Sequence, residues 1–391
     1  MKNQTGNNLI PSGKAGLYVH IPFCRKKCIY CDFYSVGERK ADWTKYIDAV
    51  LKEWNDRRHE LSGAEEVTIY IGGGTPSLIP EAEFTRLSGQ LKEPLVEAGI
   101  NISEFTIEVN PDDVSEEKAA VWKMAGADRI SMGVQSLNDA ELKSIGRRHD
   151  SACAVKAYHI LRNHFSNISL DIMFGLPGQT LESLGETVRG MIALRPEHLS
   201  AYSLMYEERT AITRLRDMGM VEEISEESSV EMFRLISGMF SDAGYKRYEI
   251  SNYSLPGCRS IHNSNYWQGF PYVGLGPGAH SYDGERVRKW NIPDVWKYIE
   301  SVNKGEYESV AESEILGMDE LREEMIMTRL RTAEGLDTEE FGSRFGTTSC
   351  RTFMNKAEKY ISTGFMEKED AFIRLTDKGV MISDDIMSDL F

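Results

Sequence analysis

Six strand-like segments, each followed by a helix-like segment, constrain this chain more than any other feature. The strands are predicted at residues 17–23, 67–71, 105–109, 129–134, 168–174 and 198–204. Successive strands joined by helices run parallel, because a parallel connection needs a crossover and the crossover takes one hand. The pattern predicts an α/β fold with a complete or partial β/α barrel, and an open doubly wound sheet is the alternative.

The pattern changes to helices after about residue 291. Helices are predicted at residues 321–330, 338–345 and 350–361, followed by two short strands within 365–375 and a last short helix. Three helices and a hairpin resemble a winged helix. We therefore expect three parts: a flexible N-terminal tail at residues 1–16, a barrel with an extension at 17–290, and a helical, winged-helix-like domain at 291–391.

Charge and hydropathy limit the classes of partner. The chain has 391 residues with 45 Lys+Arg and 61 Asp+Glu, a formal charge of −16. This acidic balance argues against nucleic acid as the main partner. No apolar run approaches the roughly 18 residues of a membrane helix. The polar N-terminus contains no signal-peptide core, so we expect a cytoplasmic protein without a membrane span.

Three of the six cysteines lie within eight residues. Cys24, Cys28 and Cys31 are separated by three and by two residues, while the other three cysteines are scattered. Three thiolates can hold three corners of a four-iron cluster, which leaves one iron open. The intervening Arg25-Lys26-Lys27 would favour thiolates. Spacing favours iron–sulfur, but a zinc site completed by His20 or Asp32 stays open.

Polar residues follow or end the predicted strands. They are Gly72-Gly73-Gly74-Thr75-Pro76, Glu108 with Asn110, Gln135 with Ser136, and Arg147 one helix later, while Asp171 lies within the fifth strand. The C-terminal strand ends of a β/α barrel form one mouth, where active sites lie. Taken singly, the glycines could form an ordinary turn and Glu108 could cap a helix. Together they predict a pocket that binds an amino acid carboxylate, an ammonium group and ribose hydroxyls.

The CxxxCxxC loop and the GGGTP turn resemble the radical S-adenosylmethionine superfamily. Within it, YVHIPFCRKKCIYCDF, EVNPDD, ISMGVQS, RRH and LDIMFGLPGQT are similar to oxygen-independent coproporphyrinogen oxidases and their relatives, from residue 18 to about 280. The resemblance implies a partial (β/α)6 barrel. It also implies a [4Fe–4S] cluster, S-adenosylmethionine and an electron donor that reduces the cluster.

The resemblance also implies residue roles. Cys24, Cys28 and Cys31 would ligate the cluster, and S-adenosylmethionine would chelate its open iron. Gly73, Gly74 and Thr75 would contact the methionine part, with Tyr18 and Tyr30 beside the cofactor and Glu108, Gln135, Arg147 and Asp171 completing the pocket. Reductive cleavage of the cofactor would give methionine and a 5′-deoxyadenosyl radical.

Two features resemble the HemW-type haem chaperones rather than the oxidases. Phe33 stands where the oxidases have a further cysteine, and only 23 residues precede Cys24. The segment His262-Asn263-Ser264-Asn265-Tyr266-Trp267 also matches the chaperones' HNxxYW motif. The resemblance implies haem as ligand, haem-accepting proteins as partners, and no coproporphyrinogen oxidase activity. An oxygen-independent coproporphyrinogen III oxidase is the alternative, and a pure haem binder that leaves S-adenosylmethionine intact is another.

Histidine is a common axial haem ligand, and tyrosine and tryptophan can stack on a porphyrin. The alternative role for His262 is a hydrogen-bonding residue that caps the barrel. Cys258, four residues earlier, is a weaker candidate for a thiolate ligand. His280, in a glycine-rich turn, is expected to form hydrogen bonds at the barrel rim.

Overall fold

The computed structural model describes residues 13–391. Most of the tail expected at residues 1–16 therefore lies outside the described residues. Residues 14–16 do not belong to such a tail, because the first strand, β1 (Lys14–Ile21), already begins there. Lys14 pairs with Glu66, and Gly16 pairs with both Thr68 and Tyr272. The start of the barrel is thus fixed on both sides by neighbouring strands.

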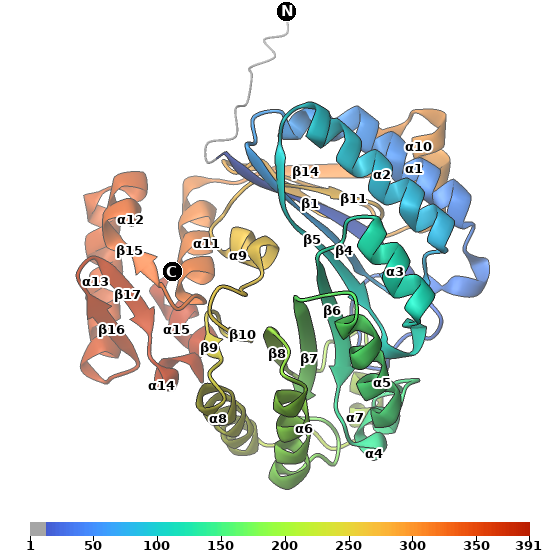
Figure 1. Ribbon diagram of the computed structural model, residues 1–391. Helices are drawn as coiled ribbons and strands as arrows, with labels where there is room; N and C mark the ends of the chain where they lie inside the picture. Colours follow the sequence, from blue (N-terminus) through green and yellow to red (C-terminus); the bar gives the residue numbers. More distant parts are fainter. Residues whose placement is uncertain (1–12) are drawn as a thin grey trace, which may run out of the picture.

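Six parallel strands form the centre of the fold, which confirms the predicted partial (β/α)6 barrel. In sheet order they are β1, β4 (Glu66–Gly73), β5 (Asn101–Val109), β6 (Arg129–Gln135), β7 (Ile168–Phe174) and β8 (His198–Ser203). The convex face of the curved sheet is covered by helices (Figure 1). These are α1 (Trp43–Arg57), α2 (Glu81–Glu97), α3 (Glu116–Met124), α4 (Asp139–Ser144), α5 (Ser151–Arg162) and α6 (Leu181–Leu194).

The sheet continues beyond both edge strands of the barrel, β1 and β8, which the sequence pattern did not predict. Beside β1 lie β11 (Tyr272–Leu275), β12 (His280–Tyr282), β13 (Val287–Asn291) and β14 (Ala311–Ile315), and beside β8 lie β10 (Asn252–Ser254) and β9 (Lys246–Arg247). These added strands are short, so they show little of the alternating pattern that reveals a strand. Extension at both edges keeps the barrel open, because β1 and β8 pair with other strands instead of with each other.

The remaining elements are connections. They are the helices α7 (Ala211–Asp217), α8 (Glu226–Asp242), α9 (Ile261–Trp267) and α10 (Val295–Lys304), the short pair β2 (Phe23–Cys24) and β3 (Val36–Gly37), and 3-10 turns at Glu38–Lys40, Arg58–Leu61, Pro76–Leu78, Pro111–Asp113 and Tyr307–Ser309. No helix among residues 13–391 is long and apolar enough to cross a membrane.

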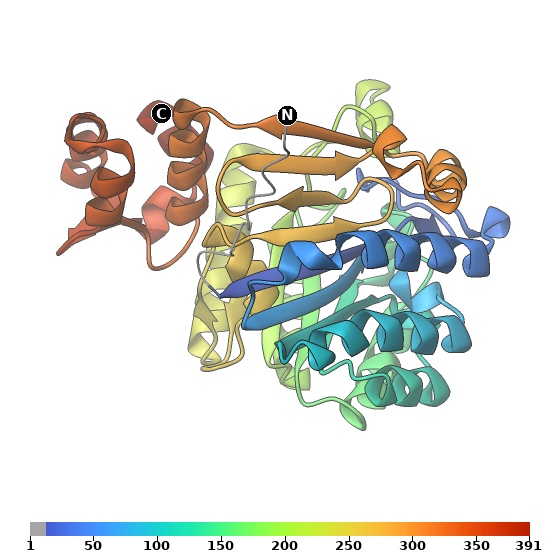
Figure 2. The same cartoon turned by 90° about the horizontal axis from the view of Figure 1, so that it is seen from above.

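The C-terminal unit has its own apolar core, centred on Phe341 and Phe353. It contains the helices α11 (Met318–Leu330), α12 (Thr338–Phe345), α13 (Thr347–Ser362), α14 (Asp377–Val380) and α15 (Ser383–Leu390), with β15 (Leu336–Asp337), β16 (Met366–Glu369) and β17 (Phe372–Leu375). Figure 2 shows it set to one side of the large sheet. The expected boundary at residue 291 falls inside the barrel unit, because β14 pairs with β13 and α10 packs on α1. The change of unit lies between Ile315 and Met318.

One buried carboxylate joins the sheet extension to the barrel. Glu53 on α1 is fully buried and accepts hydrogen bonds from Arg57 (2.8 Å) and the Gly276 backbone N–H (2.9 Å). It also accepts from the Asn291 amide (2.9 Å) and the Tyr298 hydroxyl (2.6 Å). Four donors from separate segments therefore converge on one charge, which pairs the charge and satisfies its oxygens.

We expect Glu53→Gln to lower the thermal midpoint of unfolding. The amide replaces an acceptor oxygen with a donor that faces other donors, and it leaves the buried Arg57 guanidinium with one carboxylate partner, Glu60, in place of two. Breaking such a buried pair costs about 3 kcal/mol. The matched control is Glu300→Gln, which removes an exposed pair with Lys304. Equal midpoints for the two variants, measured by circular dichroism, would contradict this role of Glu53.

Candidate functional site

The three clustered cysteines lie in the loop that follows β1. Cys24 is buried at the end of β2, while Cys28 and Cys31 are half-buried. The backbone N–H of Ile29 donates to Ile145 (3.4 Å), and the N–H of Ile212 donates to the Ile29 carbonyl (2.9 Å). The loop is therefore anchored to the segment after α4 and to the start of α7, which fixes the cysteines over the barrel mouth.

Burial raises the pKa of the Cys24 thiol and raises that of Cys31 to about 11. The neighbouring Cys28 adds to both shifts, and Lys27 opposes them. The three sulfurs are thus close enough to affect each other electrostatically. Without a bound cation, the raised pKa values of Cys24 and Cys31 favour their protonated forms, so a positively charged iron centre would supply the missing stabilisation of these thiolates.

The zinc alternative lacks a fourth ligand. His20 contacts the Tyr18 hydroxyl through Nδ1 (3.0 Å) and the Tyr34 carbonyl through Nε2 (2.9 Å), and Asp32 is exposed. Across residues 13–391, no three His, Cys, Asp or Glu side chains converge closely enough to hold a single metal ion. In a four-iron cluster each cysteine binds a different iron, so the ligands stand further apart. The loop fits such a cluster better than it fits zinc.

The glycine turn after β4 packs directly against the cysteine loop. Gly73 has φ +108°, and a Cβ atom there would lie 2.6 Å from His20 Nδ1. A Cβ at Gly74 would lie 2.8 Å from the Ile21 carbonyl oxygen and 3.0 Å from Cys24 Sγ. The next residue, Thr75, donates its hydroxyl to Cys24 Sγ (3.4 Å). These close approaches require glycine, so the turn is not an ordinary loop and belongs to the site.

Glu108 ends β5 and points into the barrel. It accepts hydrogen bonds from the Tyr70 hydroxyl (2.8 Å) and from the Gly73 backbone N–H (3.0 Å). Enclosure by the barrel interior raises its pKa to about 7, and the nearby Asp171 carboxylate adds to the shift. Glu108 therefore links the glycine turn to the barrel interior and can gain or lose a proton near neutral pH.

Arg147 connects the cysteine loop to β6. Its guanidinium donates to Cys28 Sγ (3.6 Å), to Asn110 Oδ1 (3.0 Å) and to the Gly133 carbonyl. Gln135, where β6 ends, has φ +70°, an uncommon conformation for a residue other than glycine, next to an irregularity in the pairing of β6 with β7. The break in regular pairing re-aims this strand end at the mouth.

Asp171, Tyr18 and Tyr30 complete the predicted set. Asp171 accepts hydrogen bonds from Ser131 (3.3 Å) and Ser169 (3.4 Å), and burial raises its pKa. The Tyr18 ring lies 6.2 Å from the Tyr70 ring, and burial raises the pKa of Tyr30 beside the cysteines. The predicted cluster and cofactor residues are therefore brought together on the concave face of the sheet and at its mouth.

His262 lies elsewhere. It belongs to α9 and is buried, with Nδ1 against the Thr68 hydroxyl (2.7 Å) and Nε2 against the Tyr266 hydroxyl (2.9 Å). A Cβ at Gly16, near the start of β1, would lie 3.3 Å from its ring. Burial lowers its pKa to about 3, so the ring is neutral. In this structure His262 closes the end of the barrel opposite the cysteines and offers no free nitrogen to a haem iron, contrary to the expected haem contact.

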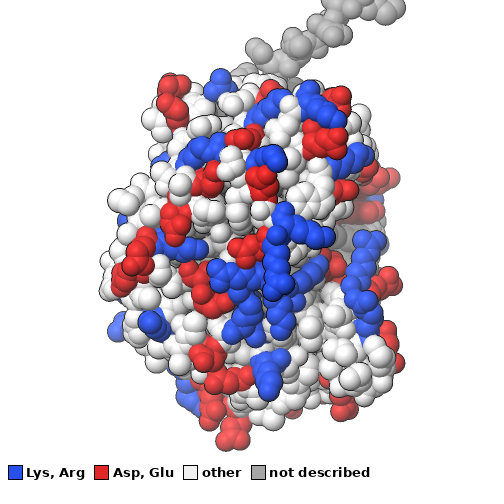
Figure 3. Space-filling model, turned by 90° about the vertical axis from the view of Figure 1, so that its right-hand side faces the viewer, with Lys and Arg blue, Asp and Glu red and all other residues white. Residues whose placement is uncertain are grey.

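Positive charge gathers on the cysteine side despite the acidic chain. Figure 3 shows lysine and arginine side chains collected in the middle of the face that carries α3 and α5. In the cysteine loop, Arg25 pairs with Glu38 (3.3 Å) and with the buried Asp113 (3.3 Å). Arg148 pairs with Asp112 on the same side. The cysteine loop therefore contains and neighbours arginine side chains that are held by ion pairs.

Comparison with known proteins identifies the two units separately. The Radical SAM superfamily matches residues 18–190, and the HemN C-terminal domain matches residues 318–382. The solved structure of coproporphyrinogen III oxidase (HemN) from Escherichia coli, described as a radical SAM enzyme, superposes with a TM-score of 0.81 at 21% identity. The match covers 98% of this chain and 90% of that one. This likeness confirms the fold.

Curated relatives are similar over almost the full length. The heme chaperone HemW of Bacillus subtilis is 33% identical over 372 residues, which are 94% of this chain and 97% of that protein. The heme chaperone HemW of Lactococcus lactis is 32% identical over 94% of this chain and 95% of that protein. The mitochondrial radical S-adenosyl methionine domain-containing protein 1 of Mus musculus is 33% identical over 83% of this chain and 75% of that protein. The chain therefore belongs to the HemW family of the radical S-adenosylmethionine superfamily.

Proposed function

We propose that this protein binds haem and transfers it to haem-dependent proteins, with a [4Fe–4S] cluster and S-adenosylmethionine at the barrel mouth. Similarity over 94% of the chain to proteins named heme chaperones carries the proposal. Phe33 supports it, because this residue stands where the oxidases have a further cysteine. The Phe33 side chain is 68% exposed. The oxidase alternative is not favoured by these relatives.

Different residues of the mouth bind the two cofactors in this proposal. Cys24, Cys28 and Cys31 hold the cluster, and Thr75 and Arg147 donate hydrogen bonds to Cys24 and Cys28. Donors to the sulfurs stabilise thiolates and tune the potential of a cluster. When bound, the cluster and S-adenosylmethionine supply one-electron chemistry at the sulfonium. Glu108 and the glycine turn would orient the cofactor, and the Glu108 carboxylate would favour its positive charge.

The electron donor in this proposal is an acidic carrier. The basic residues collected on the cysteine side would attract it and bring it close to the cluster loop. The proposed setting is the cytoplasm, where thiols stay reduced, and all six cysteines are free thiols in the structure.

We expect Cys28→Ala to abolish the cluster and to leave the fold intact. The change removes one of three thiolate ligands from a half-buried loop position. Iron and acid-labile sulfide should fall to near zero after anaerobic reconstitution, with an unchanged circular dichroism spectrum. Cys258→Ala, outside the loop, is the control and should retain full iron. Stoichiometric zinc with no iron in the reconstituted wild type would refute a cluster.

We expect the affinity for S-adenosylmethionine to rise more steeply with pH around neutrality in the wild type than in Glu108→Gln. Glu108 has a pKa of about 7, so it ionises as the pH rises through that value and then attracts the cationic cofactor. The gain should approach about tenfold per pH unit below the pKa. Anaerobic calorimetry of the reconstituted protein between pH 6 and 8 measures it. Comparison with the variant removes the titration of the cofactor itself.

The same pKa gives the sign of the effect on stability. Because the folded pKa lies above the ordinary value of 4.5, the folded state binds more protons between these values. The contribution of Glu108 to the stability of the cofactor-free protein is therefore greatest below about pH 4.5 and is lost as the pH rises through 7. Parallel pH profiles for wild type and Glu108→Gln would contradict both statements. Glu117→Gln, an exposed carboxylate change on α3, is the control.

We expect no decarboxylation of coproporphyrinogen by the reduced protein with S-adenosylmethionine. Phe33→Cys should not create the activity, because Phe33 is exposed and a single thiol adds no further substrate contacts. Porphyrin products are measured by chromatography after anaerobic incubation, with an authentic oxidase as the positive control. Rescue of a strain lacking both types of coproporphyrinogen oxidase would overturn the expectation.

A further inference from the structure

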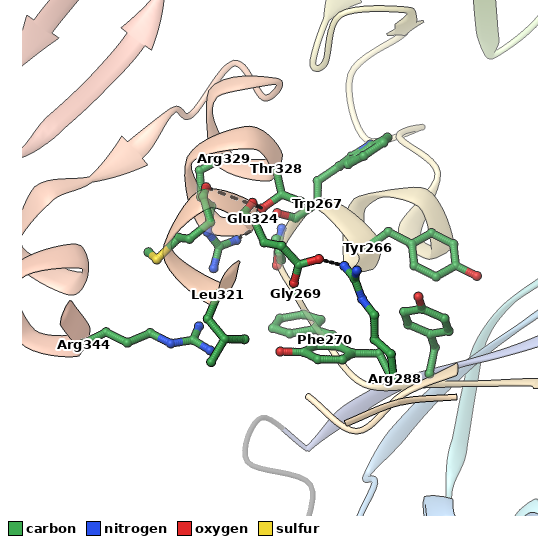
Figure 4. Close-up of a pocket in the computed structure, with 14 residues that line it drawn as sticks. Tyr266, Trp267, Gly269, Phe270, Arg288, Leu321, Glu324, Thr328, Arg329 and Arg344 are labelled. Atoms are coloured by element: carbon green, nitrogen blue, oxygen red, sulfur yellow. Dashed lines mark hydrogen bonds and ion pairs between the residues drawn. The ribbon is translucent and has the colours of Figure 1, made fainter. Parts of the chain in front are cut away.

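A pocket of about 300 Å³ lies where the sheet extension meets the C-terminal unit. One wall comes from the end of α9 and from β11 to β13, and the other comes from α11 with Arg344 of α12 (Figure 4). The side chains that matter here are aromatic or cationic: Tyr266, Phe270, Tyr272, Tyr282, Arg288 and Arg344. Flat apolar rings beside guanidinium groups suit a planar aromatic anion.

An exposed histidine lies on the same face of the sheet as this pocket. Successive side chains of a strand alternate between faces, so His280 points to the same side as Tyr282, two residues or about 6.5 Å further along β12. The strand pairing places Arg288 opposite Tyr282 and Trp290 opposite His280. The Trp290 ring stacks on the His280 ring at 5.9 Å between centroids and 24° between planes.

The His280 ring is available as a ligand. Neither of its nitrogens hydrogen-bonds to another residue within 13–391, so it does not act as the expected hydrogen-bonding residue of the rim. Partial burial and then the nearby Arg288 lower its pKa, which keeps the ring neutral at physiological pH. A neutral imidazole carries the free lone pair that an iron needs. His262, by contrast, is buried and hydrogen-bonded through both nitrogens.

This face continues into the cofactor site. Tyr18 pairs with Gly274 and Tyr272 pairs with Tyr282, so Tyr18, Tyr272 and His280 share the concave side of one curved sheet. β12 begins at the end of the sheet where β1 and β11 finish, which is the mouth end. A ligand on His280 would therefore lie beside the cluster site, with its far edge directed toward α11.

We infer that haem binds on the concave face of β11 to β13, with His280 as an axial ligand of the iron and Arg344 and Arg288 at the propionates. The inference rests on the proposed haem function and assigns its site. The imidazole lone pair forms the bond to the iron, and the oxidation state of the iron does not change. Trp290 and Tyr282 supply rings for the porphyrin edge.

The charges around the site fit a ligand that is later released. Arg288 pairs with Glu324 of α11 and lies 3.8 Å from Glu314, while no carboxylate lies within 4.0 Å of Arg344 among residues 13–391. Arg344 is thus the cation available to a propionate, whereas a propionate reaching Arg288 competes with Glu324. Because α11 supplies that competitor, displacement of the C-terminal unit by an acceptor protein would alter the binding of haem.

Titration of the full chain with ferric haem tests the site. We expect His280→Ala to shift the Soret band and to weaken binding about tenfold or more, which is about 1.4 kcal/mol. His159→Ala, which removes another exposed histidine that contacts one aromatic ring, is the matched control and should leave the spectrum unchanged. His262→Gln should also leave the Soret band in place. Iron content and circular dichroism verify the fold of each variant.

Haem dimethyl ester tests the propionate contact. Wild type should bind the ester more weakly than haem, and Arg344→Gln should reduce that preference. An unchanged Soret band and affinity in His280→Ala, or a shift confined to His262→Gln, would overturn the site while leaving the haem function standing. No binding of haem by the wild-type holoprotein would overturn both.

Discussion

The close approach of two backbone segments at the Gly73–Gly74 turn is the constraint on which the site depends. The Gly74 N–H donates to the Ile21 carbonyl (2.6 Å), and neither glycine has room for a Cβ atom beside His20, Ile21 and Cys24. This contact fixes the end of β4 against the root of the cysteine loop. Thr75 then reaches Cys24, and the Gly73 N–H reaches Glu108. One steric requirement thereby positions both the proposed cluster ligands and the proposed cofactor contacts.

Buried charge organises the rest of the barrel. Glu108 and Asp171 face the interior with raised pKa values caused by burial, and Arg147 spans from Cys28 to β6. On the convex side, the Glu53 carboxylate joins α1 to the turn after β11. The interior charges suit a cationic cofactor, while Glu53 fixes the strands that carry the inferred haem site.

The sheet extension carries the surface on which we infer that haem binds. The six barrel strands carry the cysteine loop and the glycine turn. The strands from β11 to β13 present His280, Tyr282 and Arg288 on the same concave face. The C-terminal unit closes this surface through α11, where Glu324 pairs with Arg288. Haem held between the two units would be sensitive to their relative position, as a transfer protein requires.

The sequence by itself determined the six parallel strands, the three cysteines, the glycine turn and the helices of the C-terminal unit. These features are local: apolar periodicity, cysteine spacing and turn residues appear within short windows of sequence. The sequence pattern also placed Glu108, Gln135 and Asp171 correctly at strand ends or within a strand.

Only the tertiary structure decided which histidine is buried and hydrogen-bonded and which is exposed, since a histidine in sequence does not show what surrounds its ring. His262 meets Thr68, 194 residues away, whereas strand pairing brings His280 to Trp290 on an exposed face. The short strands of the extension escaped prediction for the same reason: pairing with distant strands, rather than local pattern, makes them strands.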